Sequence, residues 1–426
     1  MKRLVVLGAG TAGTMVVNKL RPRLRHDEWS VTVVDQDNDH LYQPGLLLLP
    51  FGDYTREQLL QPRDRFIPQG VDLRLSPIER VDTEAQEVVL SGGSRIPYDF
   101  LIIATGTTPR PDQTPGMLGS EWRRSIFDFY TLGGALALRD ALTIFDRGRL
   151  VVHVVEMPIK CPVAPLEFSF LADAHFTDRG IRDRVDITYV TPLEGAFTKP
   201  VASRRLGTML ADRHINLEGD FVVERIDPER KVLVSYDERE VPFDLLVTVP
   251  LNMGADYIAA SGLGDELNFV PVDRHTLLSR DHANIFAIGD ASDIPASKAG
   301  SVAHFSVELF VDNFLAHVAG RPMVKLFDGH ANCFVESGHG KGMLIDFNYE
   351  TEPLAGKYPL PRVGPFSLLA ESRVNHWGKL AFRWAYWHLL LRGRPIPVPA
   401  RMSMAGKHPE PDPEPDPERS PVGAAR

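Results

Sequence analysis

The chain has 426 residues, a length that predicts two or three domains. Hydrophobic residues make up 43% and charged residues 24%, which is typical of a soluble globular protein with an ample core. The formal net charge of -9 argues against nucleic acid as a partner. Five of the acids lie in PEPDPEPDPE at 409–418, so we expect residues 401–426 to form a disordered, acidic, Pro-rich tail.

The ends and apolar runs of the sequence bear on its location. The first strand begins almost at Met1, so no signal peptide is expected. No apolar run approaches the roughly 18 to 20 residues that a spanning helix needs. We therefore expect the protein to remain on the cytoplasmic side of the membrane. Two cysteines occur, Cys161 and Cys333, and in a cytosolic chain two unrelated buried thiols are the ordinary interpretation.

Residues 2–35 follow the order strand, glycine turn, helix, strand. Gly8, Gly10 and Gly13 form G-x-G-x-x-G directly after LVVL, and Asp35 ends the next strand. The glycines let backbone approach a pyrophosphate, and the carboxylate accepts the ribose hydroxyls of an adenosine. The alternative, a glycine turn that serves packing alone, is weaker. This segment predicts a dinucleotide site.

Two later segments complete the predicted cofactor site. YDFLIIATG at 98–106 is a buried strand that ends in small residues, and NIFAIGDASD at 284–293 places Gly289 and Asp290 after another strand. An acid there can bond the ribityl chain of a flavin, and a helix beginning after Lys298 aims its positive end at the ring. The alternative for Gly-Asp is a simple turn. The segments together predict FAD.

The residues predicted to contact FAD belong to these segments or lie between them. They are Gly8, Gly10, Thr11, Ala12, Gly13, Asp35, Gln36, Gln43, Ile78, Ala104, Thr105, Gly106, Gly289, Asp290 and Lys298. The loop HLYQPGLLLLPFGDYT at 40–55 is expected to lie against something flat and apolar, or else to be packed in the core. A helix is expected from Arg56 to Phe66.

A second βαβ unit begins near residue 149 and departs from the dinucleotide pattern. The run Val151 to Glu156 would normally lead into a glycine turn, but MPIKCPVA follows and contains no glycine. Backbone therefore cannot approach a second pyrophosphate, and NAD(P)H is not expected there. The turn instead presents Cys161 beside Lys160. Further strands are expected at 149–156 and 185–191 and in FVVERID, KVLVSY and FDLLVTVP.

The C-terminal portion carries the second cysteine and a basic helix. Cys333 is expected on a strand before Phe334, and the nearby histidines lack the fourth ligand and spacing of a metal site, so no metal is predicted. The final helix is expected to carry one apolar face, made of Trp377, Leu380, Ala381, Trp384, Trp387 and Leu391. Six Arg or Lys and no acid lie between Ser372 and Arg401, which is typical of a membrane-interface helix. The alternatives are packing in the core and a dimer contact.

These elements predict an α/β protein with two Rossmann-like βαβ domains of the glutathione-reductase-like type and a C-terminal membrane-interface region. The expected division is an FAD-binding domain at 1–112 and 267–325, a second Rossmann-like domain at 113–266 and an interface region at 326–400, followed by the tail.

Several of these motifs together resemble the sulfide:quinone oxidoreductase family. They are GAGTAG, HLYQPG, PIKCP, IGD and a Cys-Phe pair followed by a basic amphipathic helix, spread over residues 1–395. Flavocytochrome c sulfide dehydrogenase shares the cysteine pair but is exported. The resemblance implies that Cys161 and Cys333 form a redox pair joined by a disulfide or polysulfur bridge. Hydrosulfide attacks the bridge, one sulfur keeps the added atom as a persulfide, and the other thiolate attacks the flavin.

The resemblance also implies roles for other residues. Lys160 would lower the pKa of Cys161, and Glu167 would shuttle a proton unless it is a solvated helix residue. A membrane quinone would enter between the final helix and Phe334, with Phe382 and Tyr386 lining its path. Lys298 would bond a carbonyl of the flavin or quinone. The protein would be peripheral on the cell membrane, with homo-oligomers a further expectation.

The chain departs from that family at two points. Many members carry a third cysteine where SIFD has Phe127, and a histidine expected shortly after the fifth strand of the second unit is missing from TPLEGAFTKP. Two other functions compete. A type II NADH:quinone dehydrogenase would need a glycine turn near residues 158–164, and a non-catalytic flavin redox sensor would use its cysteines without turnover.

Overall fold

The computed structural model describes residues 1–359 and 364–408, and its first sheet is parallel throughout. The sheet has the order β20-β9-β1-β2-β5. Its strands are β1 (Lys2–Leu7), β2 (Trp29–Asp35), β5 (Val71–Leu75), β9 (Phe100–Ile103) and β20 (Ile285–Ala287). The central strands are apolar and buried, and helices α1 (Thr11–Leu20) and α7 (Gly300–Val318) pack against each other beside the sheet. The strand β20 returns the chain to this sheet after the second domain.

The second sheet repeats the parallel arrangement. Its order is β11-β18-β12-β13-β14, with β11 (Ile126–Phe127), β12 (Gly148–Val154), β13 (Val185–Val190), β14 (Ile215–Glu218) and β18 (Leu245–Val249). Helices α3 (Leu132–Ile144), α4 (Ala164–Asp178) and α5 (Pro200–Asp212) complete the domain. These two parallel sheets confirm the predicted α/β fold with two Rossmann-like domains.

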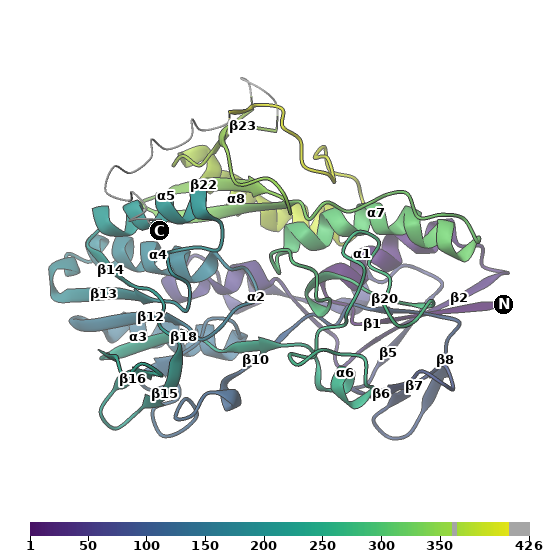
Figure 1. Ribbon diagram of the computed structural model, residues 1–426, viewed down its shortest axis with the longest axis horizontal. Helices are drawn as coiled ribbons and strands as arrows, with labels where there is room; N and C mark the ends of the chain where they lie inside the picture. Colours follow the sequence, from purple (N-terminus) through teal and green to yellow (C-terminus); the bar gives the residue numbers. More distant parts are fainter. Residues whose placement is uncertain (360–363, 409–426) are drawn as a thin grey trace, which may run out of the picture.

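A third, mixed sheet follows the two Rossmann-like domains. Its order is β21-β22-β24-β23-β25, with β21 (Ala331–Gly338), β22 (Lys341–Phe347), β23 (Ala355–Tyr358), β24 (Phe366–Leu368) and β25 (Lys407–His408). Helix α8 (Arg373–Ala385) packs on β22 and continues as a π-helical turn over Tyr386–Leu390. Strand β21 packs against both α4 and α7. Figure 1 shows this sheet and α8 lying over the first domain, in purple, and the second domain, in teal.

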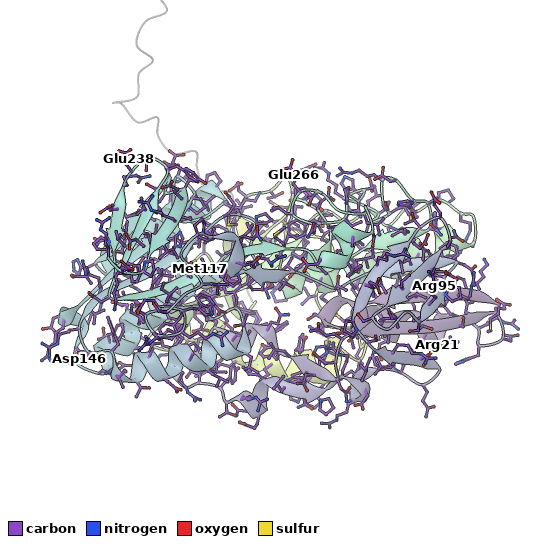
Figure 2. All side chains as sticks on the ribbon, turned by 90° about the horizontal axis from the view of Figure 1, so that it is seen from below. Arg21, Arg95, Met117, Asp146, Glu238 and Glu266 are labelled. Carbon is purple, nitrogen blue, oxygen red and sulfur yellow. The ribbon has the colours of Figure 1, made fainter. Side chains whose placement is uncertain are left out.

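Small antiparallel sheets and short turns complete the fold. They comprise β3 (Asp39–Leu41) with β4 (Leu60–Pro62); β6 (Ile78–Asp82), β7 (Glu87–Leu90) and β8 (Arg95–Pro97); β10 (Thr108–Arg110) with β19 (Leu251–Met253); and β15 (Val223–Asp227), β16 (Val232–Ser235) and β17 (Glu240–Pro242). Helices α2 (Arg56–Leu59) and α6 (Asp256–Ala260) are short. Figure 2 places Arg95 of β8 and Asp146, after α3, toward opposite ends of the molecule.

Three sequence predictions differ from the structure. The helix expected from Arg56 to Phe66 ends at Leu59, because Leu60–Pro62 forms a strand with β3 and Pro62 cannot continue a helix. Residues 401–408 are not a disordered tail, since β25 pairs with β23 and Lys407 is buried beside Asp346. The remainder of the predicted tail, 409–426, lies outside the described residues.

The third difference concerns the final helix, whose apolar residues do not share one face. Trp377 and Trp384 are 63% and 60% exposed, whereas Trp387 and Leu391 are buried. The π-helical turn after Ala385 changes the residues per turn and so rotates the last aromatic residues toward the first domain. No helix in the described ranges is long and apolar enough to cross a membrane.

Candidate active site

Cys161 lies in the turn between β12 and α4, in a backbone conformation that few non-glycine residues adopt. Its φ is +47°. Three hydrogen bonds fix it there: its N–H donates to the carbonyl of Lys298 at 2.7 Å, and its carbonyl accepts from the amide of Ala164 at 2.8 Å and the hydroxyl of Tyr130 at 3.3 Å. Strain of this kind persists when the surroundings over-determine it, and it is common at functional sites.

Cys333 reaches the same place from the third sheet. It lies on β21 and is 8% exposed, and Ser301 in the first turn of α7 lowers the pKa of its thiol. Both cysteines are free thiols in this structure, and the charge of Cys333 raises the pKa of Cys161. The fold thus brings together two residues that are far apart in sequence.

A buried ion pair stands beside the two thiols. Glu167, fully buried on α4, accepts a hydrogen bond from the amide of Glu336 at 2.7 Å and pairs with the ammonium of Lys379 from α8. The other carboxylate oxygen of Glu167, Oε1, is buried without a hydrogen-bond partner among the described residues. Burial raises the pKa of Glu167, while Lys379 opposes that shift. Glu167 is therefore not a solvated helix residue.

Electrostatics at this site favour neutral thiols. Burial and, after it, the Glu167 carboxylate raise the pKa of Cys161 well above its usual range and that of Cys333 to about 12. Lys379 lowers both values. A thiolate nucleophile at this site therefore depends on Lys379, or on a proton acceptor that takes the thiol proton.

The charge of Asp290 acts on both Lys160 and Lys298. Burial lowers the pKa of Lys160, while the charges of Asp290 and Asp128 oppose that shift. The ammonium of Lys298 donates to the carbonyls of Asp290 and Ser292, each at 2.9 Å, and lies 3.7 Å from the centre of the Phe269 ring. Lys298 thus shapes the site mainly through its carbonyl, which holds Cys161.

The glycine turn after β1 has the geometry of a dinucleotide cradle. A Cβ at Gly8 would lie 2.5 Å from the carbonyl oxygen of Ala104, and one at Gly13 would lie 1.9 Å from that of Gly8, so both must be glycine. Space is open within 4 Å of a Cβ at Gly10 and at Gly106. The turn meets the N-terminus of α1, where a pyrophosphate is favoured.

The acids predicted for FAD are placed consistently with that role. Asp35 accepts from the amides of Ala9 at 2.7 Å and Gln36 at 2.8 Å and pairs with Arg63 at 2.9 Å. Asp290 lies between Lys160 and Lys298, and its carboxylate accepts no hydrogen bond from any described residue. It is therefore available to a bound hydroxyl. The residues present fit FAD.

The other predicted cofactor residues surround this cradle in differing ways. Thr11 begins α1 and Ala12 follows it, Ala104 packs under Gly8, and the hydroxyl of Thr105 lies 3.1 Å from that of Tyr257. Gly289 has a φ of +66° beside Ala12. Gln36 and Gln43 are exposed, and Ile78 begins β6 half-buried. The loop 40–55 is largely packed in the core, as residues 45–50 are all buried.

The three aromatic residues predicted for quinone divide into two places. The ring of Phe334 packs edge-on against Phe366 at 5.2 Å, over Gly378. Phe382 lies beside Tyr42 and Tyr386. The hydroxyl of Tyr386 is held by Thr11 at 2.8 Å and His40 at 2.7 Å, so it ties α8 to the dinucleotide turn.

The sequence of this fold matches a known family over most of its length. Residues 2–306 match the family described as pyridine nucleotide-disulphide oxidoreductase. The chain belongs to that family. Among proteins similar to this oxidoreductase, the mitochondrial sulfide:quinone oxidoreductase of Dictyostelium discoideum is 25% identical over 398 residues, which cover 92% of this chain and 86% of that one. The corresponding protein of Schizosaccharomyces pombe is 27% identical over 427 residues, covering 92% and 90%.

Solved structures agree with this membership of the family. The sulfide:quinone oxidoreductase of Aquifex aeolicus superimposes with a TM-score of 0.77 at 19% identity, covering 92% of both chains. The comparisons confirm the resemblance to sulfide:quinone oxidoreductases, and they confirm that this chain is an oxidoreductase with FAD as its cofactor. No cluster of metal-ligating side chains occurs in the described parts of the chain.

Sequence reasoning missed several residues of the site. Lys379 is one of the six basic residues between Ser372 and Arg401 that are typical of a membrane-interface helix, yet it pairs with the buried Glu167. Tyr130, Ser301 and Glu336 belong to no motif. One signal was available. The inward face of α8 shows the helical spacing Asn375, Lys379, Phe382, Tyr386, which places Lys379 opposite the exposed tryptophans.

Proposed function

We propose that this protein oxidises hydrosulfide through Cys161 and Cys333 and passes the electrons by way of FAD to a membrane quinone. The observation that carries this proposal is that the charges of Glu167 and Lys379 act on both thiols, beside the turn after β12 where a glycine turn would otherwise bind a second nucleotide. Pro165 in the first turn of α4 also leaves that helix end without one of its free amides. A sulfur site thus replaces a nicotinamide site, and relatives named sulfide:quinone oxidoreductases support this function.

Residues of the chain divide the work of the reaction. Ser301 and the N-terminus of α7 stabilise a thiolate at Cys333, and Lys379 does so at both sulfurs. Glu167 offers a buried free oxygen as proton acceptor. FAD, when bound, supplies a two-electron acceptor that can pass electrons onward. The chain holds it through the glycine turn, Asp35 and Asp290.

We also propose that α8 rests on the membrane surface and that quinone enters beside it. Val374, Trp377, Ala381 and Trp384 recur at three- and four-residue spacing on the exposed face of α8, and Arg373, Arg392 and Arg394 are exposed nearby. Indole rings and arginines on one face suit a headgroup interface. Phe334 and Phe366 lie beneath this helix and would line the entry.

Anaerobic titration of the purified protein tests this function. We expect sulfide, and not NADH, to bleach the flavin absorbance, and a quinone analogue to restore it. Cys161→Ala and Cys333→Ala should each lower the bleaching rate by a factor on the order of 100 or more, because either change removes a nucleophile. Rapid bleaching by NADH would favour a type II NADH:quinone dehydrogenase, and bleaching by neither would favour a redox sensor. A cysteine variant with the wild-type rate would refute the paired-cysteine mechanism.

A further inference from the structure

A row of titratable groups leads from the two thiols to the molecular surface along α8. It begins at Glu167, which pairs with Lys379. The charge of Lys379 also acts on Glu336, a β21 residue whose side chain is 2% exposed. Glu336 accepts a hydrogen bond from Nδ1 of His376 at 2.8 Å, and the His376 side chain is 24% exposed. His376 is therefore the point at which this row meets solvent.

The charges of this row of residues are balanced when the row holds one additional proton. Two carboxylates face one ammonium, so the buried cluster is neutral when it holds a single further proton on Glu167, Glu336 or His376. A neutral state costs least desolvation, and moving that proton from one member to the next leaves the total charge unchanged. Oε1 of Glu167 and Oε1 of Glu336 are both buried without a hydrogen-bond partner among the described residues. Each carboxylate thus keeps a free site for the proton.

From this arrangement we propose that Glu167, Lys379, Glu336 and His376 form the exit path for the proton that hydrosulfide carries into the site. The proposal rests on the proposed function. When HS⁻ attacks a bridge between Cys161 and Cys333, the cysteine sulfur–sulfur bond breaks, a new one forms to the incoming sulfur, and the other cysteine leaves as thiolate. The resulting persulfide, Cys–S–SH, retains the proton. Its transfer to Glu167 and onward to His376 leaves a persulfide anion and releases one proton to solvent.

The path also accounts for a feature of the sequence. The segment TPLEGAFTKP, where a site histidine was expected, contains none. His376 supplies an imidazole from a different element. The charged groups that act on it are Glu336 of β21 and Asp53 of the loop before α2, and Lys379 follows three residues later on α8. Glu336 and His376 are positioning and relay residues, whereas Glu167 is the member of the row whose charge acts on both thiols.

The test follows flavin bleaching by sulfide and proton release to a pH-indicator dye in one stopped-flow experiment. In His376→Ala, we expect both rates to fall by a factor on the order of 10 to 100, the scale of a lost proton-transfer step. Added imidazole should restore both, and substituted imidazoles should do so according to their basicity. Glu336→Gln should show the same loss without rescue. His388→Ala, at an exposed histidine of the same helical segment, serves as the control and should match the wild type.

The outcomes separate the path from the function. If sulfide bleaches His376→Ala and Glu336→Gln at the wild-type rate, protons leave by another route and the path is refuted while the proposed function stands. A loss in His376→Ala that no imidazole restores would assign His376 a structural role and would also refute the path. If sulfide fails to bleach the wild type, the proposed function fails and the exit path falls with it.

Discussion

At the scale of single residues, the ammonium of Lys379 decides how reactive the site can be. Burial and Glu167 both disfavour thiolates at Cys161 and Cys333, and Lys379 is the cation that opposes them. Lys160, which is adjacent to Cys161 in sequence, is itself influenced by the charges of Asp290 and Asp128, which raise its pKa against the effect of burial. The role of Lys160 stays a prediction, and Lys379 is a second cation at the site that no sequence motif indicates.

We predict that Lys379→Met raises the pH at which the two thiols become reactive. Lys379 lowers the thiol pKa values, so its removal should shift the pH midpoint of alkylation by iodoacetamide upward in the reduced apoprotein. The change also leaves Glu167 buried without its partner, which should destabilise the fold by about 3–5 kcal/mol. Thermal unfolding of Lys379→Met and of the double variant with Glu167→Leu provides the control, since the second change should recover much of the stability. An unchanged alkylation midpoint would contradict the prediction.

At the scale of elements, helix α8 has two faces with different tasks. Its inward face carries Lys379 to the thiols and Tyr386 to the dinucleotide turn, and its outward face exposes two tryptophans. Gly378 lets α8 pack closely against the rings of Phe334 on β21 and Phe366 on β24. A Cβ there would lie 2.5 Å from Cε1 of Phe366 and 3.0 Å from Cζ of Phe334.

Gly378→Val should therefore impair the quinone step and spare the sulfide step. The added methyl groups would push the rings of Phe334 and Phe366 out of the proposed quinone entry. We expect the KM for a quinone analogue to rise about tenfold, with sulfide bleaching within about twofold of the wild type. Gly207→Ala in helix α5, where a Cβ meets no atom within 4 Å, is the matched control. A KM like that of the wild type would remove Phe334 and Phe366 from the quinone path.

The sequence predicted elements best where local chemistry alone decides them. The motif Gly8, Gly10 and Gly13 predicts its turn from sequence, because close backbone contacts exclude any side chain at Gly8 and Gly13. The extra β4 strand, the π-helical turn after Ala385 and the inward aim of Lys379 depend on partners distant in sequence. Such tertiary effects override local periodicity, so the site's thiols could be named from sequence while the ion pair beside them could not.

At the scale of the whole molecule, the third sheet packs against both Rossmann-like domains. A buried ion pair between β22 and β25 stabilises this sheet. Asp346 on β22 accepts hydrogen bonds from His330 at 2.7 Å and Asn332 at 3.0 Å and pairs with Lys407 of β25. The side chains of Asp346 and Lys407 are both fully buried. Asn332 adjoins Cys333, so this cluster supports the strand that carries the second thiol.

Lys407→Met should consequently loosen the third sheet. Asp346 would lose its buried cation, at a cost of about 3–5 kcal/mol, and the thermal midpoint should fall by several degrees. Lys357→Met is the control, because Lys357 lies on the neighbouring strand β23 and bonds Ser367 at an exposed site. Differential scanning fluorimetry of both variants distinguishes them, and equal midpoints would show that the Asp346–Lys407 pair contributes little.

The two thiols are carried by separate parts of the molecule, Cys161 by the second Rossmann-like domain and Cys333 by the sheet above it. A disulfide or polysulfur bridge between them would therefore be a covalent cross-link between two parts of the fold as well as a store of oxidising equivalents. Each turnover would break and re-form this cross-link, so the rigidity of the protein would depend on its redox state. A resting oxidised enzyme would then resist heat and proteases better than one kept reduced.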